Sequence, residues 1–201
     1  MRPRRTWLLL VSLLLPTIGR SQADSATTPD PFLRAIEAEL DSMYGPLVYL
    51  MRPEQRGVYP SLSVAGKRQF LRRFWAERDP TRGTPRNEAE EAFNKRIAVV
   101  NQKFHERGEG GGDVPGWRTD RGRIYLEYGP PDITLSRRGP GRTPPFEVWK
   151  YTRGKPRKYC FVDVTRFGNY ALVYSTDPRE PTRPDWRQLL DDQAYEETLR
   201  F

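Results

Sequence analysis

The hydrophobic pattern of the chain changes its period once, near Gly122. Before this point, apolar residues recur every three or four positions, a spacing that places them on one face of an α-helix. After it, apolar and polar residues alternate, which is typical of β-strands. The pattern therefore predicts an α+β fold, in which N-terminal helices are followed by a small four-stranded antiparallel sheet and a C-terminal helix.

The first predicted helix begins at Asp30 and Pro31. Asp30 can cap the first amides, Pro31 suits the first helical position, and Gly45 followed by a proline ends the helix. Prolines and a glycine then interrupt residues 47–62. This segment is expected to form a connecting loop with no regular element beyond a short turn.

Two further helices are predicted before the change of period. One follows Ser63, carries an apolar stripe of phenylalanine, leucine and tryptophan at helical spacing, and stops at Pro80. The other is expected to be capped by Thr84, to start at Pro85 and to continue to the region of Phe104. Both apolar faces are expected to lie in the core.

Four short strands are predicted next, because four segments are rich in aromatic and β-branched residues and are bounded by Gly or Pro. They are residues 123–128, 147–152, 158–164 and 169–175. A loop at 135–145 separates the first two, and residues 185–201 return to helical spacing in an acidic tail that can fold back on the basic segment. Residues 108–116, GEGGGDVPG, hold too many glycines for a helix or a strand and are expected to form a flexible link.

The N-terminus has the three parts of a secretory signal peptide. Basic residues at 2–5 precede an apolar run at 7–15 and small residues up to Ala23. We expect cleavage after Ala23, so that residues 1–23 are removed and the mature protein is exported, to the periplasm or out of the cell. The apolar run is shorter than the roughly 20 residues that cross a bilayer, so no transmembrane segment is expected after cleavage.

The 178 residues that remain are enough for one domain with an appendage. Residues 24–61 are expected to form an N-terminal helix and linker, and residues 62–201 the main domain. The single Cys160 cannot form an intramolecular disulfide, and its apolar neighbours predict an inert, buried thiol. Because His105 is also single, no metal site and no cofactor are predicted.

The formal charge of +8 falls to +4 once the four arginines of the signal peptide are removed, and it is unevenly distributed. Residues 117–166 hold twelve basic and five acidic residues, whereas residues 177–201 hold four and seven. A solvated arginine-rich surface is one interpretation. The other is that Arg137, Arg138 and Arg142 face solvent and bind an anionic partner, either an envelope protein or an anionic polymer. Nucleic acid is not expected as the partner of an exported protein.

One stretch concentrates the polar chemistry of the chain, GWRTDRGRIYLEYGPPD at residues 116–132. Its last four residues are expected to end the strand at 128 rigidly. The candidate site residues in it are Gly116, Trp117, Thr119, Asp120, Arg121, Gly122, Arg123, Gly129, Pro130, Pro131 and Asp132.

The favoured interpretation of this stretch is a structural corner. Gly116 and Gly122 permit positive φ, Thr119 and Asp120 can accept hydrogen bonds from amides one to three residues further on, and Trp117 can anchor the corner in the core. Arg123 and Arg78 are expected to pair with Asp79, Asp120 or Asp132.

The alternative interpretation is catalytic. Asp120 and Asp132 could serve as acid and base in a hydrolase or transferase of envelope polymers, provided that they lie at a suitable separation in unlike environments. The sequence shows neither condition. A recognition module for proteins or polymers is therefore preferred to an enzyme.

The stretch closely resembles the motif that gives the GWxTD domain family of bacterial proteins its name. The resemblance extends upstream to FWAERDPTRGTPRNEAEEAFNKRI at 74–97 and downstream to FEVWKY and FVDVTRFGNYALV, as far as Val173. It implies an exported, envelope-associated protein in which a helical part leads into the motif and a small sheet, and it implies no particular activity. The glycine insertion at 108–112 and the arginine-rich loop depart from the family pattern.

Overall fold

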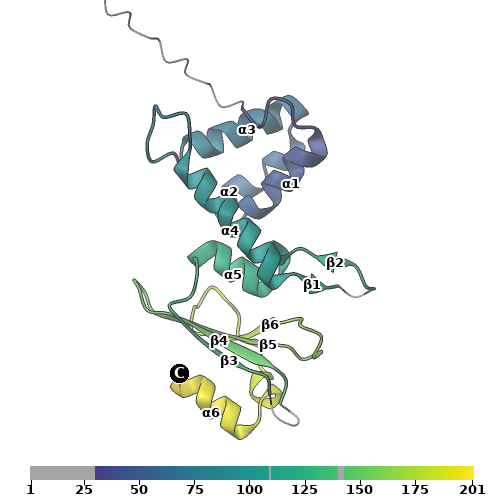
Figure 1. The fold of residues 1–201 in the computed structure, drawn as a ribbon, viewed down its shortest axis with the longest axis vertical. Helices are drawn as coiled ribbons and strands as arrows, with labels where there is room; N and C mark the ends of the chain where they lie inside the picture. The colour runs from purple at the N-terminus through teal and green to yellow at the C-terminus, as the bar shows by residue number, and fades with distance from the viewer. Residues whose placement is uncertain (1–29, 109, 140–142) are drawn as a thin grey trace, which may run out of the picture.

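The computed structural model describes residues 30–108, 110–139 and 143–201. The predicted signal peptide lies outside these ranges. Figure 1 shows helices α1 to α4 at one end of the molecule, the sheet with α6 at the other end, and α5 between them. Within the described ranges, no helix is both long enough and apolar enough to cross a membrane.

The order of elements is the predicted one, helices before sheet. The helices are α1 (Glu37–Leu47), α2 (Pro53–Arg56), α3 (Val64–Ala76), α4 (Glu88–Phe104), α5 (Asp120–Tyr128) and α6 (Asp192–Arg200). The strands are β1 (Glu106–Arg107), β2 (Asp113–Val114), β3 (Ile133–Arg137), β4 (Phe146–Tyr151), β5 (Arg157–Val162) and β6 (Ala171–Ser175). Short 3₁₀ turns are η1 (Tyr59–Ser61), η2 (Gly116–Arg118) and η3 (Trp186–Leu189). The fold is therefore α+β.

The first helix starts later than predicted. Asp30 does not cap it, because its carboxylate accepts the amide of Phe32 (2.9 Å) in a separate turn. The helix begins at Glu37 instead, where the Glu39 carboxylate accepts the amide of Ile36 (2.9 Å). It continues through Gly45 and one proline before it ends at Leu47.

The second and third predicted helices are confirmed as α3 and α4. Ser63 caps α3 by accepting the amide of Gly66 (3.3 Å). Thr84 does not cap α4, because Asn87 does so and also donates to the Trp75 carbonyl (2.8 Å). The Asn87 side chain therefore caps α4 and at the same time links α4 to α3.

The sheet is antiparallel in the order β3-β4-β5-β6, and one of its strands differs from the prediction. The strand predicted at 123–128 is wrong, because these residues belong to helix α5. The fourth strand of the sheet is instead β3, which was not predicted and whose last residues fall in the segment predicted to be a loop, 135–145. The prediction of an unstructured link at 108–116 is also wrong in part, because β1 and β2 pair as a short hairpin closed by a bond from the Gly108 amide to the Gly112 carbonyl (2.7 Å).

Side chains from the two faces of the sheet enter two separate clusters. Trp149, Tyr159 and Phe161 face the helices α1 to α5, as part of the larger cluster. The opposite face packs under η3 and α6, and Cys160 is fully buried there. The predicted burial of Cys160 is confirmed, and this burial raises the pKa of its thiol to about 12.

Candidate functional site

The motif forms the junction between the helical part and the sheet, through η2 and the start of α5. Thr119 is the N-cap of α5, since its hydroxyl accepts the amide of Gly122 (3.1 Å) and donates to the Gly116 carbonyl (2.8 Å). The predicted acceptor role of Thr119 is confirmed, but the element that it starts is a helix rather than a strand. Gly129, with φ 79°, ends this helix in the conformation that glycine adopts most easily.

Gly116 and Gly122 allow close packing rather than positive φ, which corrects their predicted role. A Cβ atom at Gly116 would lie 1.9 Å from the Val100 carbonyl oxygen of α4. A Cβ atom at Gly122 would lie 1.8 Å from the Gly116 carbonyl oxygen. Because glycine has no side chain, the backbones of α4, η2 and α5 can lie in direct contact at these two positions.

Trp117 joins the motif to the first helix. Its ring lies against Gly45, where an added Cβ would be 2.9 Å from the ring, and it meets Tyr49 edge-on at 6.5 Å. Its backbone amide donates to Asn101 of α4 (3.2 Å). The ring is half-buried, so it anchors the corner as predicted but at the edge of the core.

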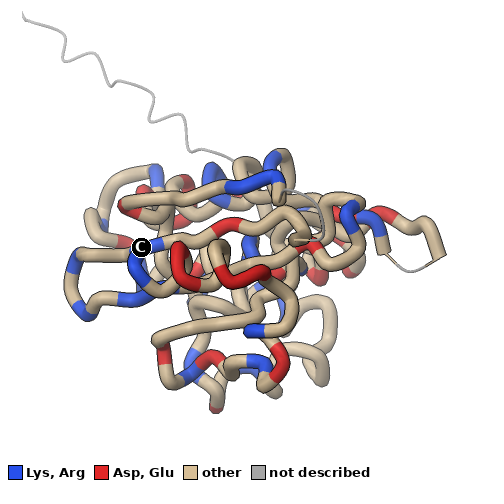
Figure 2. The backbone as a smooth tube through the Cα atoms, turned by 90° about the horizontal axis from the view of Figure 1, so that it is seen from below, with Lys and Arg blue, Asp and Glu red and all other residues tan. Residues whose placement is uncertain are grey.

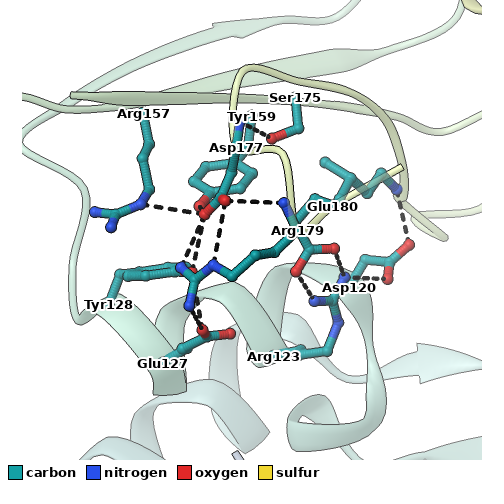
Figure 3. A network of polar contacts seen from close by, with 11 residues as sticks. Asp120, Arg123, Glu127, Tyr128, Arg157, Tyr159, Ser175, Asp177, Arg179 and Glu180 are labelled. Carbon is teal, nitrogen blue, oxygen red and sulfur yellow. Dashed lines mark hydrogen bonds and ion pairs between the residues drawn. The ribbon is translucent and has the colours of Figure 1, made fainter. Parts of the chain in front are cut away.

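Asp120 binds the edge strand of the sheet and not its own turn, as Figure 3 shows. Its carboxylate accepts the backbone amide of Leu172 in β6 (2.8 Å) and a bond from Arg123 (3.3 Å). Arg123 also forms a two-point ion pair with Glu180, one arm of which measures 2.9 Å. Although burial opposes the charge, the bonds to Glu180 raise the pKa of Arg123 above its ordinary value.

Arg121 is buried, and its side chain contacts other residues inside the protein. Its guanidinium lies between Glu106 (3.6 Å) and Glu147 (3.5 Å) and over the ring of Tyr170 (3.8 Å to the centroid). Burial raises the pKa of Glu106. The predicted pairing of Arg123 with Asp120 is confirmed (3.3 Å), whereas the pairing of Arg121 with Glu106 and Glu147 was not predicted.

Asp132 fixes the end of β4 and the turn that follows. It accepts the amide and hydroxyl of Thr152 (2.7 and 3.0 Å) and the amide and Nε of Arg153 (3.3 and 2.6 Å). The Thr152 amide and Arg153 together lower the pKa of Asp132 to about 2. Nearby, the Tyr151 hydroxyl donates to the Gly129 carbonyl (2.9 Å), and the two prolines that follow Gly129 lead into β3.

Asp120 and Asp132 do not form a shared site. Asp120 is the first residue of the nine-residue helix α5, and Asp132 lies beyond its other end. The helix is roughly 13 Å long at 1.5 Å per residue, and the two carboxylates share no bonding partner. Paired carboxylates of glycosidases stand about 5 to 9.5 Å apart. The structure therefore does not bring the predicted acid and base together.

An open cleft of about 490 Å³ lies beside the motif, between the β1–β2 hairpin and the turn that joins β5 to β6. Arg107, Arg118 and Arg183 line it, together with Thr119 and Asp120. Arg183 pairs with Asp185 (2.9 Å), whereas Arg107 and Arg118 pair with no carboxylate in the part of the chain that the structure describes. The apolar lining residues are Val114, Val162, Val164, Tyr170 and Ala171.

Comparison with known families identifies the chain. The model of the GWxTD domain matches residues 28–187, which include α1 to α5 and the whole sheet. The protein belongs to the GWxTD domain family. No curated protein and no solved structure matches it.

Asp177 is a buried carboxylate of the GWxTD domain that is absent from the predicted site residues. Figure 3 shows it facing α5 from the turn after β6. It accepts bonds from the hydroxyls of Tyr128 and Tyr159 (3.0 Å each), from Arg157 Nε (3.1 Å), and from the amide and guanidinium of Arg179 (3.0 to 3.2 Å). These bonds, above all those from Arg179, lower the pKa of Asp177.

A sequence signal for Asp177 does exist. It follows a predicted strand in the order Ser-Thr-Asp-Pro at 175–178, and an aspartate before proline after a strand is typical of a turn whose side chain accepts nearby amides. Nothing in the sequence indicates that two tyrosines and two arginines converge on it. Asp177 and Asp120 together attach α5 to the edge of the sheet.

The arginines predicted to form a basic binding loop have different environments. Arg137 lies in β3 and pairs with Glu197 of α6, so the acidic tail does fold back on the basic segment. Figure 2 shows acidic residues gathered along this C-terminal helix. Arg138 is exposed, and Arg142 lies outside the described residues. Within the described ranges, no group of three or more His, Cys, Asp or Glu side chains is arranged to hold a metal ion.

Proposed function

We propose that this GWxTD protein is exported and acts in the bacterial envelope as a recognition module, binding an acidic segment of a partner protein in the cleft beside the motif. One observation carries the proposal. The carboxylates of the motif are bonded to backbone amides and arginines, while the guanidinium groups of Arg107 and Arg118 line an open cleft without a carboxylate partner among the described residues. Such a surface attracts anions instead of performing proton transfer.

The lining favours a peptide over a polysaccharide. Val114, Val164 and Ala171 lie in the same cleft as the arginines, so the ligand is expected to carry apolar groups next to its negative charges. An acidic peptide with aliphatic side chains meets both requirements. The volume of the cleft falls within the range of roughly 300 to 1,000 Å³ found for pockets that bind small ligands.

One observation favours an enzyme. Asp120 lines the cleft, and its side chain is 38% exposed. A hydrolase or transferase of envelope polymers would need this carboxylate for turnover, and a second catalytic group other than Asp132. Loss of a measurable activity in Asp120→Asn, with stability unchanged, would establish that alternative.

The experiment is a crosslinked pull-down of the mature protein from its own envelope fraction. We expect Arg107→Ser/Arg118→Ser to lose a partner protein that the parent retains, and the retained complex to weaken with salt. The matched control is Arg34→Ser/Arg73→Ser, because both arginines are exposed and lie among the N-terminal helices. If all three proteins recover the same partners, the cleft is not the binding site; recovery of an anionic polysaccharide instead of a protein would contradict the acidic peptide.

Export is tested separately by mass spectrometry of the protein isolated from cells. We expect the mature chain to begin at Asp24, because the small residues up to Ala23 form the predicted cleavage site. A chain that retains Met1 would contradict the proposal.

A further inference from the structure

Three segments meet at one end of the sheet. The β1–β2 hairpin is tied to the β5–β6 turn because Asn169 bonds both backbone groups of Arg107 (3.2 and 2.9 Å). The same turn is tied to the chain before β4, since the amide of Asp163 donates to the Pro145 carbonyl (2.9 Å) and Arg166 donates to the Thr143 carbonyl (3.3 Å). Figure 1 shows the hairpin and the turn projecting from the same side of the molecule.

The β5–β6 turn is held in one conformation by a buried carboxylate. Asp163 is 2% exposed and accepts the amide of Gly168 (2.7 Å) and the hydroxyl of Thr165 (2.8 Å). Arg166 has φ 63° and is the one described non-glycine residue in the left-handed region. Such a conformation persists only where the surroundings impose it, so the turn is preorganised.

This rigid turn presents apolar side chains to solvent. Phe167 is 83% exposed and Val164 is 47% exposed, and Phe167 is the most exposed large hydrophobic residue in the described part of the chain. A phenylalanine gains free energy when it leaves water. A turn that holds its tip outward is therefore suited to contact another phase or partner.

Exposed arginines lie on segments next to this turn. Arg107 is on the β1–β2 hairpin, and Arg138 directly follows β3, whose last residue pairs with Phe146 at the start of β4. The nearby carboxylates of Asp163 and Glu106 are bonded inside the protein, while Asp113 on β2 is exposed. We call Arg107, Arg138, Val164 and Phe167 the loop surface.

We propose that the loop surface docks on an anionic phospholipid bilayer, with Phe167 inserted at the level of the headgroups and the arginines paired with lipid phosphates. A projecting aromatic tip needs a preformed pocket in a protein partner, but a bilayer yields to a convex tip without one. Basic residues near an anionic membrane add to such an anchor by electrostatic attraction. This inference goes beyond the recognition of a partner in the cleft, and either can hold without the other.

The test is co-sedimentation of the mature protein with vesicles of phosphatidylglycerol and phosphatidylethanolamine, compared with vesicles of phosphatidylcholine alone. We expect binding to the anionic vesicles only. Phe167→Ser should reduce the partition coefficient about tenfold. Arg138→Ser, at an arginine that does not line the cleft, should reduce it about fivefold. Binding of the parent should weaken as salt rises.

Ile36→Ser is the matched control, since Ile36 is 63% exposed but lies at the helical end of the molecule. Thermal unfolding of each variant shows that it is folded. Equal loss of vesicle binding in Ile36→Ser and Phe167→Ser would overturn the proposal, as would the absence of binding to anionic vesicles at low salt. If Phe167→Ser keeps vesicle binding but loses the crosslinked partner protein or a self-associated form, the loop surface contacts protein and the membrane proposal is wrong.

Discussion

The charged residues of helix α5 and those of the loop surface have opposite environments. On α5, Asp120 and Arg123 bond to segments far along the chain, to β6 and to Glu180. On the loop surface, Arg107 and Arg138 form no ion pair within the described ranges. The residues that define the motif hold the two parts of the fold together, while the charges available to a partner, on Arg107, Arg118 and Arg138, lie outside helix α5.

The largest predicted effect concerns the glycines of the junction. Gly116→Ala and Gly122→Ala should each destabilise the protein by about 4 kcal/mol or more, or prevent folding, because the added methyl would overlap a carbonyl oxygen. Denaturant unfolding measures the change. Gly57→Ala is the control, since Gly57 has φ −85° and no atom within 4 Å of an added Cβ, and it should be neutral or slightly stabilising. Tolerance of alanine at both junction positions would refute the close packing.

The next effect concerns the buried carboxylate at the other attachment of α5. Asp177→Asn should lower the free energy of unfolding by about 3 kcal/mol, because two arginines and two tyrosines would lose a charged acceptor. Asp185→Asn, at an exposed pair with Arg183, should have little effect. Similar losses in the two variants would show that the network around Asp177 contributes nothing special.

The same carboxylate predicts a pH dependence. The pKa of Asp177 is lowered in the folded state, so its stabilisation is fully present above the unfolded value of about 4 and is lost as the pH falls from there through the folded value. Unfolding measured between pH 5 and pH 2 should therefore be flatter in Asp177→Asn than in the parent. Parallel curves would contradict the assignment.

A smaller effect is expected at the cap of α5. Thr119→Ala removes the acceptor for the Gly122 amide and should destabilise the protein by about 1 to 2 kcal/mol. Thr119→Ser keeps the hydroxyl and should recover most of the loss. If serine is as harmful as alanine, packing of the methyl group outweighs the cap.

The smallest effect on stability is predicted for the cleft. Arg107→Ser/Arg118→Ser should change the free energy of unfolding by less than about 0.5 kcal/mol, because neither side chain bonds a carboxylate among the described residues. A loss of several kcal/mol would place these arginines with α5, as structural residues, and would break the comparison.

The order of elements could be predicted from the sequence because most of them present one apolar face. The stripe on α3 and the alternation in β4 to β6 each follow a single period, since each element is buried in one direction or alternates between two cores. Helix α5 could not be predicted in this way, because it is buried on more than one side. It lies between α4 and β6, and both Ile124 and Leu126 are fully buried, which imitates the alternation of a strand.

Better signals for α5 were the boundary residues. Thr119 before Asp120 is a typical N-cap, and Gly129 followed by Pro130 is a typical helix end. The partners of the site residues could not be predicted in the same way. The contacts of Asp120 with Leu172 and of Arg123 with Glu180 span more than 50 residues, and only the fold brings them together.

The central claim is that Asp120 holds α5 to the sheet and does not transfer protons. Denaturant unfolding of Asp120→Asn and Asp120→Ala tests it most directly. We expect both variants to lose stability, alanine by about 1 to 3 kcal/mol and asparagine by less, since asparagine keeps an acceptor for the Leu172 amide. If both variants match or exceed the parent in stability, as replacement of a catalytic group often allows, Asp120 is not structural and the catalytic alternative takes its place.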